Sequence, residues 1–330
     1  MPTTPMGCEV PERRAAGFVQ EARAIGNIAL CRDHFRLVMK VDQFLPAEAG
    51  QFVHVSPVRT ETNGYRIWDE GAPEAGSAVM DAAAVPMLRR AYSIAGLRRE
   101  TGGVEIEIIY RVVGKGTRWL RTLAPGDSLS VLGPLGNAFP IDPRKSMAWL
   151  VAGGVGLPPM LWLAEALRRA GKQVIAFCGA QSRDLLAMTL DDLNLPAADA
   201  TRATMSAAEF ARHGVPAVVS TDDGTLGFRG HIGAALTAYH RANPARVDDV
   251  VVYTCGPERM MRFVAEDCGA RGIECHVCME RNMACGTGMC QSCVVPIQDP
   301  ADPQAWRYWL CCTEGPIFPA RQIIWEPAGK

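Results

Sequence analysis

Five cysteines near the C-terminal end of the chain have a spacing that is suited to binding iron. Four residues separate Cys285 from Cys290, and two residues separate Cys290 from Cys293. Two adjacent candidates for a fourth ligand, Cys311 and Cys312, follow them. A C-x4-C-x2-C run with a more distant fourth cysteine is the pattern that holds a plant-type [2Fe–2S] cluster. The spacing therefore predicts a one-electron carrier, and it leaves open whether Cys311 or Cys312 completes the ligand set.

A structural zinc site is the alternative interpretation of these cysteines, because C-x2-C pairs also occur in zinc ribbons. A zinc ribbon needs a second C-x2-C pair, whereas here Cys311 and Cys312 are adjacent. The loop also contains Gly286 and Gly288. Glycine reaches backbone conformations that other residues resist, and loop N–H groups can hydrogen-bond the sulfurs. We therefore favour the iron–sulfur cluster.

The composition bounds the class of protein and its partners. The chain has 330 residues, which is enough for two or three domains. Its net charge of −1 gives no indication of binding to nucleic acid or to an anionic membrane. Residues 1–16 lack an apolar core, so no signal peptide is expected. Most of the twelve cysteines are either isolated or gathered in one region, which fits a reducing, cytoplasmic compartment. We interpret Cys275 and Cys278, a further C-x2-C, as packed strand residues.

Residues 17–142 predict an antiparallel β-barrel. Short runs of alternating apolar and polar residues are separated by turns, and one short helix is expected at 117–123. The expected strands cover residues 36–41, 51–55, 89–94, 104–110 and 128–132. Residues 56–86 break this pattern with Gly, Pro, Ala and acidic residues, and we interpret them as an inserted loop.

Two runs in this barrel could bind a phosphorylated, aromatic cofactor. Gly114-Lys-Gly116-Thr117 opens the expected helix, and free N–H groups at a helix N-terminus bind phosphate. The planar guanidinium of Arg90 could bind the same phosphates. Tyr92 has a ring for stacking, and Ser93 has a hydroxyl for hydrogen bonding. Each feature is common when taken alone, and the combination on one small barrel is much more specific.

Residues 143–271 predict a doubly wound α/β domain, because strands and helices alternate from Met147 onwards. Met147 to Ala164 carries no charge, but its glycines and prolines favour a strand, a turn and a helix over a membrane span. The turn Gly153-Gly-Val-Gly156 is a moderate dinucleotide signal, and Cys255-Gly-Pro257 follows a later strand where a nicotinamide could lie. Asp222 and Asp223 would favour an unphosphorylated ribose. Residues 272–330 form the expected cluster domain.

The whole pattern resembles the ferredoxin–NADP reductase superfamily and, within it, the electron-transfer subunits of dihydroorotate dehydrogenase B. The resemblance covers nearly the whole chain outside residues 1–16 and 56–86. It rests on these runs: Arg90-Ala-Tyr-Ser93, Gly116-Thr117, Gly153-Gly-Val-Gly156, Thr221-Asp-Asp-Gly224, Cys255-Gly-Pro257, Met283-Ala-Cys-Gly286 and Cys312-Thr-Glu-Gly-Pro316. The chain departs from the family in having Ala91 where proline is common, in the 56–86 insertion and in a long loop between Cys293 and Cys312.

The resemblance implies bound FAD, one [2Fe–2S] cluster and NAD as the soluble partner. The implied flavin residues are Arg90, Ala91, Tyr92, Ser93, Ile109, Tyr110, Arg111, Gly116 and Thr117. The implied NAD residues are Gly153, Gly154, Gly156, Cys255, Gly256 and Pro257. Among these, the implied catalytic residues are Ser93 at the reactive edge of the flavin, Tyr92 stacked near it, and Cys255. The family's Cys-x-x-Gly-Pro run matches Cys312, so the implied metal ligands are Cys285, Cys290, Cys293 and Cys312.

The same resemblance implies a partner and a reaction. Dihydroorotate would be oxidised on FMN in a separate TIM-barrel subunit, within a heterotetramer, and electrons would pass through the cluster and FAD to NAD+ in pyrimidine biosynthesis. Two alternatives stay open. One is a related FAD/[2Fe–2S] reductase subunit of the NADH-dependent ferredoxin:NADP or sulfide type, and the other is a non-catalytic, zinc-stabilised interaction module.

Overall fold

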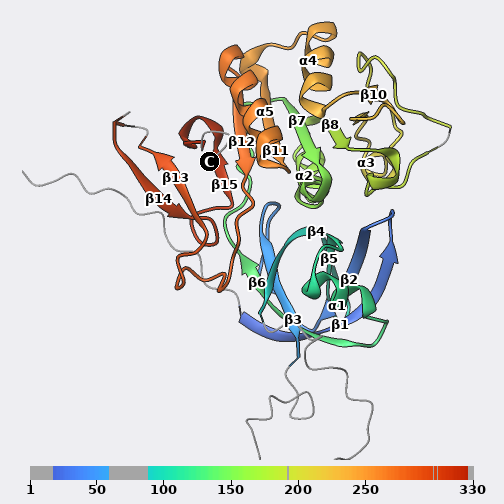
Figure 1. Ribbon diagram of the computed structural model, residues 1–330, viewed down its shortest axis with the longest axis vertical. Helices are drawn as coiled ribbons and strands as arrows, with labels where there is room; N and C mark the ends of the chain where they lie inside the picture. The colour runs from blue at the N-terminus through green and yellow to red at the C-terminus, as the bar shows by residue number, and fades with distance from the viewer. Residues whose placement is uncertain (1–17, 59–87, 192, 300, 303, 326–330) are drawn as a thin grey trace, which may run out of the picture.

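The computed structural model describes residues 18–58, 88–191, 193–299, 301–302 and 304–325. The chain forms three parts that follow one another in sequence. A β-barrel is followed by a parallel α/β sheet, and a small C-terminal unit lies beside both (Figure 1). The expectations for residues 1–16, and for nearly all of the 56–86 insertion, fall outside the described residues.

Among the described residues, six antiparallel strands close into a barrel, as the sequence predicts. They are β1 (Phe18–Ala29), β2 (His34–Val41), β3 (Phe52–Pro57), β4 (Arg90–Glu100), β5 (Gly103–Arg111) and β6 (Ser128–Leu135). The order around the barrel is β1-β2-β5-β4-β3-β6. Alternate side chains such as Leu37, Val53 and Ile106 fill the interior, because successive residues of a strand point to opposite faces.

The expected short helix is present as α1 (Lys115–Thr122), which begins directly after Gly114, two residues before the expected range of 117–123. The Thr117 hydroxyl accepts hydrogen bonds from the backbone N–H groups of Val113 and Gly114, at 2.8 and 3.0 Å. At the other end of the helix, the Asn27 amide donates to the carbonyls of Leu120 and Leu123. Both ends of this short helix are therefore held by side chains that satisfy its backbone groups.

The second part contains a seven-stranded sheet in the described chain, in the order β10-β9-β8-β7-β11-β12-β15. Its strands are β7 (Met147–Gly153), β8 (Gln173–Ala180), β9 (Ala217–Thr221), β10 (Phe228–Arg229), β11 (Val250–Cys255), β12 (Glu274–Cys278) and β15 (Ile317–Pro319). All neighbouring pairs are parallel except β12 with β15. This is the doubly wound arrangement that alternating strands and helices predict.

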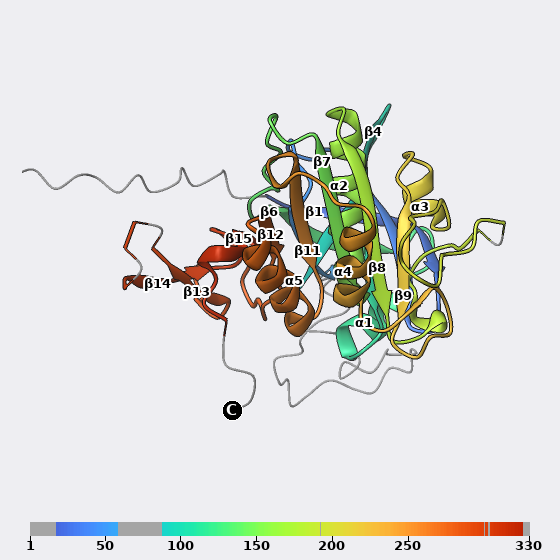
Figure 2. The same cartoon turned by 90° about the horizontal axis from the view of Figure 1, so that it is seen from above.

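Helices cover both faces of this sheet. Helix α2 (Leu157–Arg169) lies between the sheet and the barrel, and α4 (Ile232–Ala242) and α5 (Glu258–Arg271) lie on the far side (Figures 1 and 2). A short helix, α3 (Ala208–Ala211), lies beside α2. Strand β7 shows the consequence: Leu150 packs toward α2 and the barrel, whereas Trp149 packs toward α4. The uncharged segment after Met147 is thus a strand, a turn and a helix, and no helix among the described residues is long and apolar enough to cross a membrane.

The C-terminal unit is partly built into the same sheet. Strand β12 pairs with β11, and β15 pairs with β12, although both strands lie beyond the boundary expected at residues 271 and 272. Between them the chain leaves the sheet to form the cysteine loop and an antiparallel hairpin, β13 (Val294–Gln298) with β14 (Trp306–Leu310). The cysteine loop is therefore anchored at both ends by strands of the α/β sheet.

Candidate functional site

The cysteine loop points backbone N–H groups at sulfur. The N–H groups of Thr287 and Cys290 both lie 3.4 Å from the Cys285 sulfur. Burial opposes ionisation of this thiol, but these hydrogen bonds outweigh it and lower its pKa to about 6. The Cys290 thiol lies 3.2 Å from the Ser292 hydroxyl, which lowers the pKa of Cys290 as well. Thiolates are the form that binds metal, so the loop favours ligation.

The two candidates for the fourth ligand lie in different surroundings. Cys312 hydrogen-bonds the thiol of Cys293, which raises the pKa of Cys312 and lowers that of Cys293 to about 6. The N–H of Gly288 also hydrogen-bonds the Cys312 sulfur. Cys311 instead donates to the carbonyl of Met279 at 3.3 Å and is completely buried. Only the Cys312 thiol is thus in contact with another of the predicted ligands.

The predicted ligands occur as two pairs. Hydrogen bonds join the thiols of Cys285 and Cys290 in one pair and those of Cys293 and Cys312 in the other. Among the described residues, no group of three or more His, Cys, Asp or Glu side chains is gathered tightly enough to hold a metal ion. Two thiolates on each of two irons is the ligand arrangement of a Cys₄ [2Fe–2S] cluster. The residues present therefore fit this group.

The predicted flavin run lies at the start of β4, on the wall of the barrel next to β3. Ser93 pairs with Phe52 and Ala91 pairs with His54 across the two strands. The Tyr92 and Tyr110 rings meet edge to face with centroids 6.3 Å apart, and burial raises the pKa of both hydroxyls, that of Tyr110 to about 12. The Arg90 guanidinium is exposed and donates to nearby backbone carbonyls. This strand thus presents aromatic and basic groups side by side.

The second predicted flavin segment ends β5 and reaches α1. Tyr110 is buried in the barrel core and its hydroxyl donates to Asn27, which caps α1, whereas Ile109 is buried on the outer side of the barrel wall. Arg111 forms a partly exposed ion pair with Asp33 at 3.4 Å. Gly116 is buried in the first turn of α1, and the Thr117 hydroxyl hydrogen-bonds the backbone before the helix. The structure therefore links the Tyr110 segment to α1 through Asn27.

The two predicted nucleotide turns interlock. Gly153 ends β7, Gly154 begins the turn to α2, and a Cβ atom on Gly156 would lie 2.0 Å from the carbonyl oxygen of Cys255. A Cβ on Gly256, whose φ is +144°, would lie 2.7 Å from the carbonyl oxygen of Gly153. Only glycine permits this approach of two backbones. Strands β7 and β11 are adjacent although β8 and β9 lie between them in the chain, so the turns meet at the topological switch point, where open α/β sheets bind ligands.

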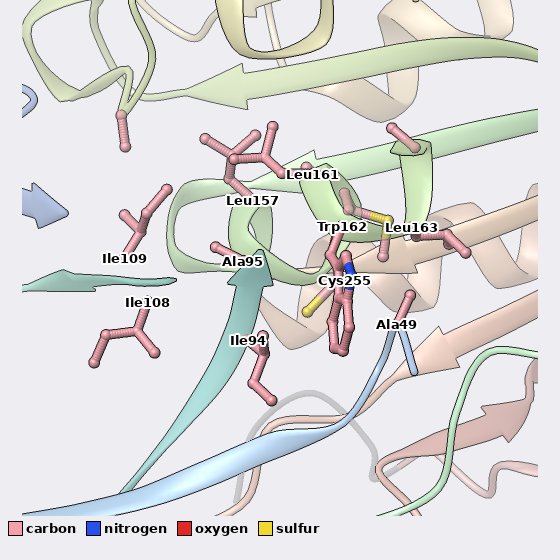
Figure 3. Packing of buried hydrophobic residues seen from close by; sticks show 14 of the residues in the cluster. Ala49, Ile94, Ala95, Ile108, Ile109, Leu157, Leu161, Trp162, Leu163 and Cys255 are labelled. Atoms are coloured by element: carbon pink, nitrogen blue, oxygen red, sulfur yellow. The ribbon is translucent and has the colours of Figure 1, made fainter. Parts of the chain in front are cut away.

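Cys255 lies in the seam between barrel and sheet. Figure 3 shows its sulfur close to Trp162 of α2 and near Ile94 and Ala95 of β4, which directly follow the predicted flavin run. Cys255 is 6% exposed and hydrogen-bonds Cys278 of β12, which raises the pKa of Cys278. Cys275 and Cys278 are buried in β12, as the sequence predicts. The eleven cysteines that the structure describes are all free.

An open cavity of about 780 Å³ lies elsewhere between the same two parts. Its lining includes Cys31 and Arg32 from the barrel and Arg183, Asp223 and Thr225 from the loops after β8 and β9. The Asp223 carboxylate accepts hydrogen bonds from the N–H and hydroxyl of Thr225, which lower its pKa. The structure thereby places one carboxylate of the predicted Asp222-Asp223 pair in a cavity of nucleotide-binding size.

One residue that the sequence analysis does not single out docks the cysteine unit on the barrel. Asn137, just after β6, donates from its amide to the carbonyls of Glu314 and Ile317, at 2.9 Å each, and accepts from the Ile317 N–H. Its own N–H donates to the Gly315 carbonyl at 2.7 Å. The segment that follows Cys312 is therefore clamped to the barrel. An Asn after a strand is so common that its sequence gives no distinguishing signal.

A second such residue is His54, in the middle of β3. It is fully buried, and burial followed by the nearby charge of Arg89 lowers its pKa to about 4. A Cβ atom on Gly286 of the cysteine loop would lie 2.8 to 3.1 Å from three atoms of the His54 ring. The sequence signal that could have identified it is one polar residue in the apolar strand Phe-Val-His-Val.

Two family models match the chain in the regions where the structure places these features. The "Iron-sulfur cluster binding domain of dihydroorotate dehydrogenase B" matches residues 280–324, and the "Oxidoreductase NAD-binding domain" matches residues 150–266. Among solved structures, the NADH-dependent reduced ferredoxin-NADP oxidoreductase is similar over 92% of this chain and 90% of its own, with a TM-score of 0.67 and 24% identity. A Neisseria gonorrhoeae ferredoxin NADP+ reductase with bound FAD and NADP has a TM-score of 0.54 at 15% identity, over 81% of this chain and 95% of its own.

Barrel, nucleotide sheet and cysteine unit together define a ferredoxin–NADP reductase-like oxidoreductase with an iron–sulfur domain. The electron transfer subunit of dihydroorotate dehydrogenase B (NAD(+)) from Geobacillus kaustophilus is 34% identical over 245 residues, which cover 74% of this chain and 82% of that protein. The Desulforamulus reducens subunit is 31% identical over 73% of this chain and 82% of its own length. The chain belongs to this family, the electron transfer subunits of dihydroorotate dehydrogenase B.

Proposed function

We propose that this chain passes electrons from a dihydroorotate-oxidising partner subunit to NAD+, as the electron-transfer subunit of an NAD-dependent dihydroorotate dehydrogenase in pyrimidine biosynthesis. The observation that carries the proposal is the position of the cysteine loop. It packs through Gly286 against β3, the direct neighbour of the strand with the predicted flavin run. A one-electron site and a flavin site thus share one wall of the barrel.

Four thiols would hold the [2Fe–2S] cluster as two pairs, Cys285 with Cys290 on one iron and Cys293 with Cys312 on the other. The hydrogen bonds within each pair support this division. The N–H groups of Thr287 and Cys290 would continue to stabilise negative charge on the Cys285 sulfur. Cys311 would stay outside the ligand set because its thiol is committed to the Met279 carbonyl.

The start of β4 and the start of α1 would hold FAD. Flavin, when bound, connects the one-electron chemistry of the cluster with the two-electron chemistry of nicotinamide. Tyr92 would supply the stacking ring, Ser93 a hydroxyl at the reactive edge, and Arg90 a cation for the phosphates. Exposure of the Arg90 guanidinium on the barrel surface supports the last assignment, since it leaves the group accessible to a ligand. Gly116 and Thr117 would lie at the phosphates.

The interlocked turns at Gly153–Gly156 and Cys255–Pro257 would hold the nicotinamide half of NAD. Their position at the switch point of the sheet supports this, as does the seam in which Cys255 meets β4 (Figure 3). The Asp223 carboxylate would favour NAD over NADP, because it repels a 2′-phosphate. Burial of Gly156, Cys255 and Gly256 would help to keep water from the place of hydride transfer.

The partner that we propose is a TIM-barrel subunit that holds FMN and oxidises dihydroorotate, joined to this chain in a cytoplasmic heterotetramer. The names of the relatives support a catalytic partner, since they describe one subunit of a dehydrogenase. The free cysteines fit a reducing compartment.

Co-expression with the candidate partner subunit, followed by anaerobic purification, tests the proposal. We expect a coloured complex that contains flavin, iron and acid-labile sulfide and that reduces NAD+ with dihydroorotate as electron donor. The partner subunit alone is the control and should pass electrons from dihydroorotate to an added artificial electron acceptor, such as a redox dye, without reducing NAD+. A colourless zinc protein would contradict the proposal, and a complex that reduces NADP+ only with reduced ferredoxin would favour the related reductase class instead.

A further inference from the structure

His54 lies at the contact between the barrel wall and the cysteine loop. Its neighbours in β3, Val53 and Val55, point into the barrel core, so His54 points outward together with Phe52. The rings of Phe52 and His54 have centroids 5.8 Å apart. In register, His54 is the cross-strand partner of Ala91, the second residue of the predicted flavin run. The imidazole therefore shares the outer face of the β3–β4 wall with Ala91 and Ser93, whereas Tyr92 and Arg90 lie on the opposite face, with Val53 and Val55.

The cysteine loop covers this imidazole with a glycine. A Cβ atom on Gly286 would approach Cε1 and Nε2 of His54 to 2.8 and 2.9 Å, closer than real Cβ contacts come, and Nδ1 to 3.1 Å. The φ angle of Gly286 is +74°, a left-handed conformation that also favours glycine. Gly286 is the residue directly after Cys285. The loop thus brings its first predicted ligand segment onto the imidazole, and the absence of a side chain makes that approach possible.

The two ring nitrogens of His54 have no hydrogen-bond partner among the residues that the structure describes, although both are completely buried. An imidazole carries at least one N–H donor in either protonation state. An unsatisfied buried donor costs about 1–3 kcal/mol. Such a group at the edge of a cofactor site indicates that its acceptor belongs to the cofactor.

We propose that His54 donates a hydrogen bond to a sulfur of the [2Fe–2S] cluster, and that it thereby positions the cluster loop on the barrel and raises the midpoint potential of the cluster. This proposal rests on the proposed function, since it requires the cluster. His54 is a positioning residue that reaches the cluster from the barrel, the part of the chain that would bind the flavin. Hydrogen bonds to cluster sulfur stabilise the more negative, reduced state, which raises the potential.

Pulsed EPR of the purified holoprotein, reduced with dithionite and labelled only at histidine with ¹⁵N, tests the contact without any variant. We expect a ¹⁵N hyperfine coupling to the reduced cluster in the wild-type protein. The same coupling should be absent from His54→Leu and present in His34→Leu. His34 is the matched control because it is a buried histidine on β2, which lies three strands from β3 in either direction around the barrel.

Redox titration of the same proteins, followed by the EPR signal of the cluster, tests the consequence. We expect a lower midpoint potential in His54→Leu, recovery toward the wild-type value in His54→Gln, which keeps an N–H donor, and no change in His34→Leu. A merely structural role of His54 would not distinguish leucine from glutamine in this way.

The outcomes separate this inference from the proposed function. A wild-type protein without iron, acid-labile sulfide and the EPR signal of a reduced cluster would refute the proposed function. A wild-type protein that has the cluster but shows no ¹⁵N coupling would overturn the inference alone. A ¹⁵N coupling that appears only on a flavin radical would also overturn it, because His54 would then donate to the flavin.

Discussion

Cys311 and Cys312 are adjacent in the chain, but their thiols have different partners. The Cys312 thiol hydrogen-bonds Cys293, whereas the Cys311 thiol donates to the Met279 carbonyl and is buried, which raises its pKa. The pKa is raised for both thiols, so the difference lies in the contacts: only Cys312 of the two contacts another predicted ligand, whereas the Cys311 thiol is committed to a backbone carbonyl. At the scale of the residue, the function depends on which neighbour each thiol has.

Replacement of each of these two cysteines in turn tests this difference. We expect Cys312→Ser to lose most of its iron and acid-labile sulfide, because one of four thiolates is removed. Cys311→Ser should keep both at the wild-type ratio per chain, since its hydroxyl can still donate to the Met279 carbonyl. Iron and sulfide analysis of the anaerobically purified proteins provides the measurement. Loss of iron from Cys311→Ser with retention in Cys312→Ser would reverse the ligand assignment.

At the scale of elements, the cysteine unit is held at four places. Strands β12 and β15 fix its two ends in the α/β sheet, and Gly286 contacts β3 of the barrel. Asn137 adds a clamp between the end of β6 and residues 314–317. Because these contacts come from both of the larger parts, the position of the cluster loop depends on how the barrel and the sheet are assembled.

Removal of the clamp should loosen the cluster loop. We expect Asn137→Ala to lower the free energy of unfolding by about 1–3 kcal/mol. The substitution removes the three hydrogen bonds of the Asn137 side chain and leaves their backbone partners unsatisfied. We also expect faster loss of iron to a chelator, followed by the decay of visible absorption. Asn243→Ala is the matched control, because this amide also donates to two carbonyls but lies at the end of α4. Equal rates of iron loss in both variants would contradict the clamp.

At the scale of the whole molecule, a charged network joins the barrel to the α/β part. Arg36 of β2 lies 3.1 Å from Glu107 of β5 and donates at 2.9 Å to Glu209 of α3. The two carboxylates are only 8% and 3% exposed, and Glu209 also accepts from the Thr189 N–H and hydroxyl. A single guanidinium thus lies between a buried carboxylate of each part and couples the two parts, and Arg98 adds a second positive charge 4.0 Å from Glu107.

Arg36→Leu should therefore destabilise the chain strongly. We expect a loss of about 3–5 kcal/mol in unfolding free energy, because the buried Glu209 carboxylate loses its ion-pair partner and Glu107 loses the nearer of two cations. Arg169→Leu is the comparison, since its pair with Glu165 is exposed on one helix and should contribute only about 0.3–0.5 kcal/mol. Denaturant unfolding of both variants measures the difference. Similar midpoints for the two variants would show that the network does not couple the parts.

Much of the fold could be predicted from the sequence. The alternating strands predict the barrel, the strand–helix alternation predicts the parallel sheet, and the spacing of Cys285, Cys290 and Cys293 predicts the cluster loop. Each of these signals depends on residues a few positions apart, and backbone geometry converts such spacing directly into local structure.

Only the tertiary structure decided the rest. The contact of His54 with Gly286, the clamp by Asn137 and the ion pair between Arg36 and Glu209 each join residues far apart in the chain. The same holds for the membership of β12 and β15 in the α/β sheet. No local periodicity reports such contacts, because they form only when the barrel, the sheet and the loop pack together and bury their shared surfaces.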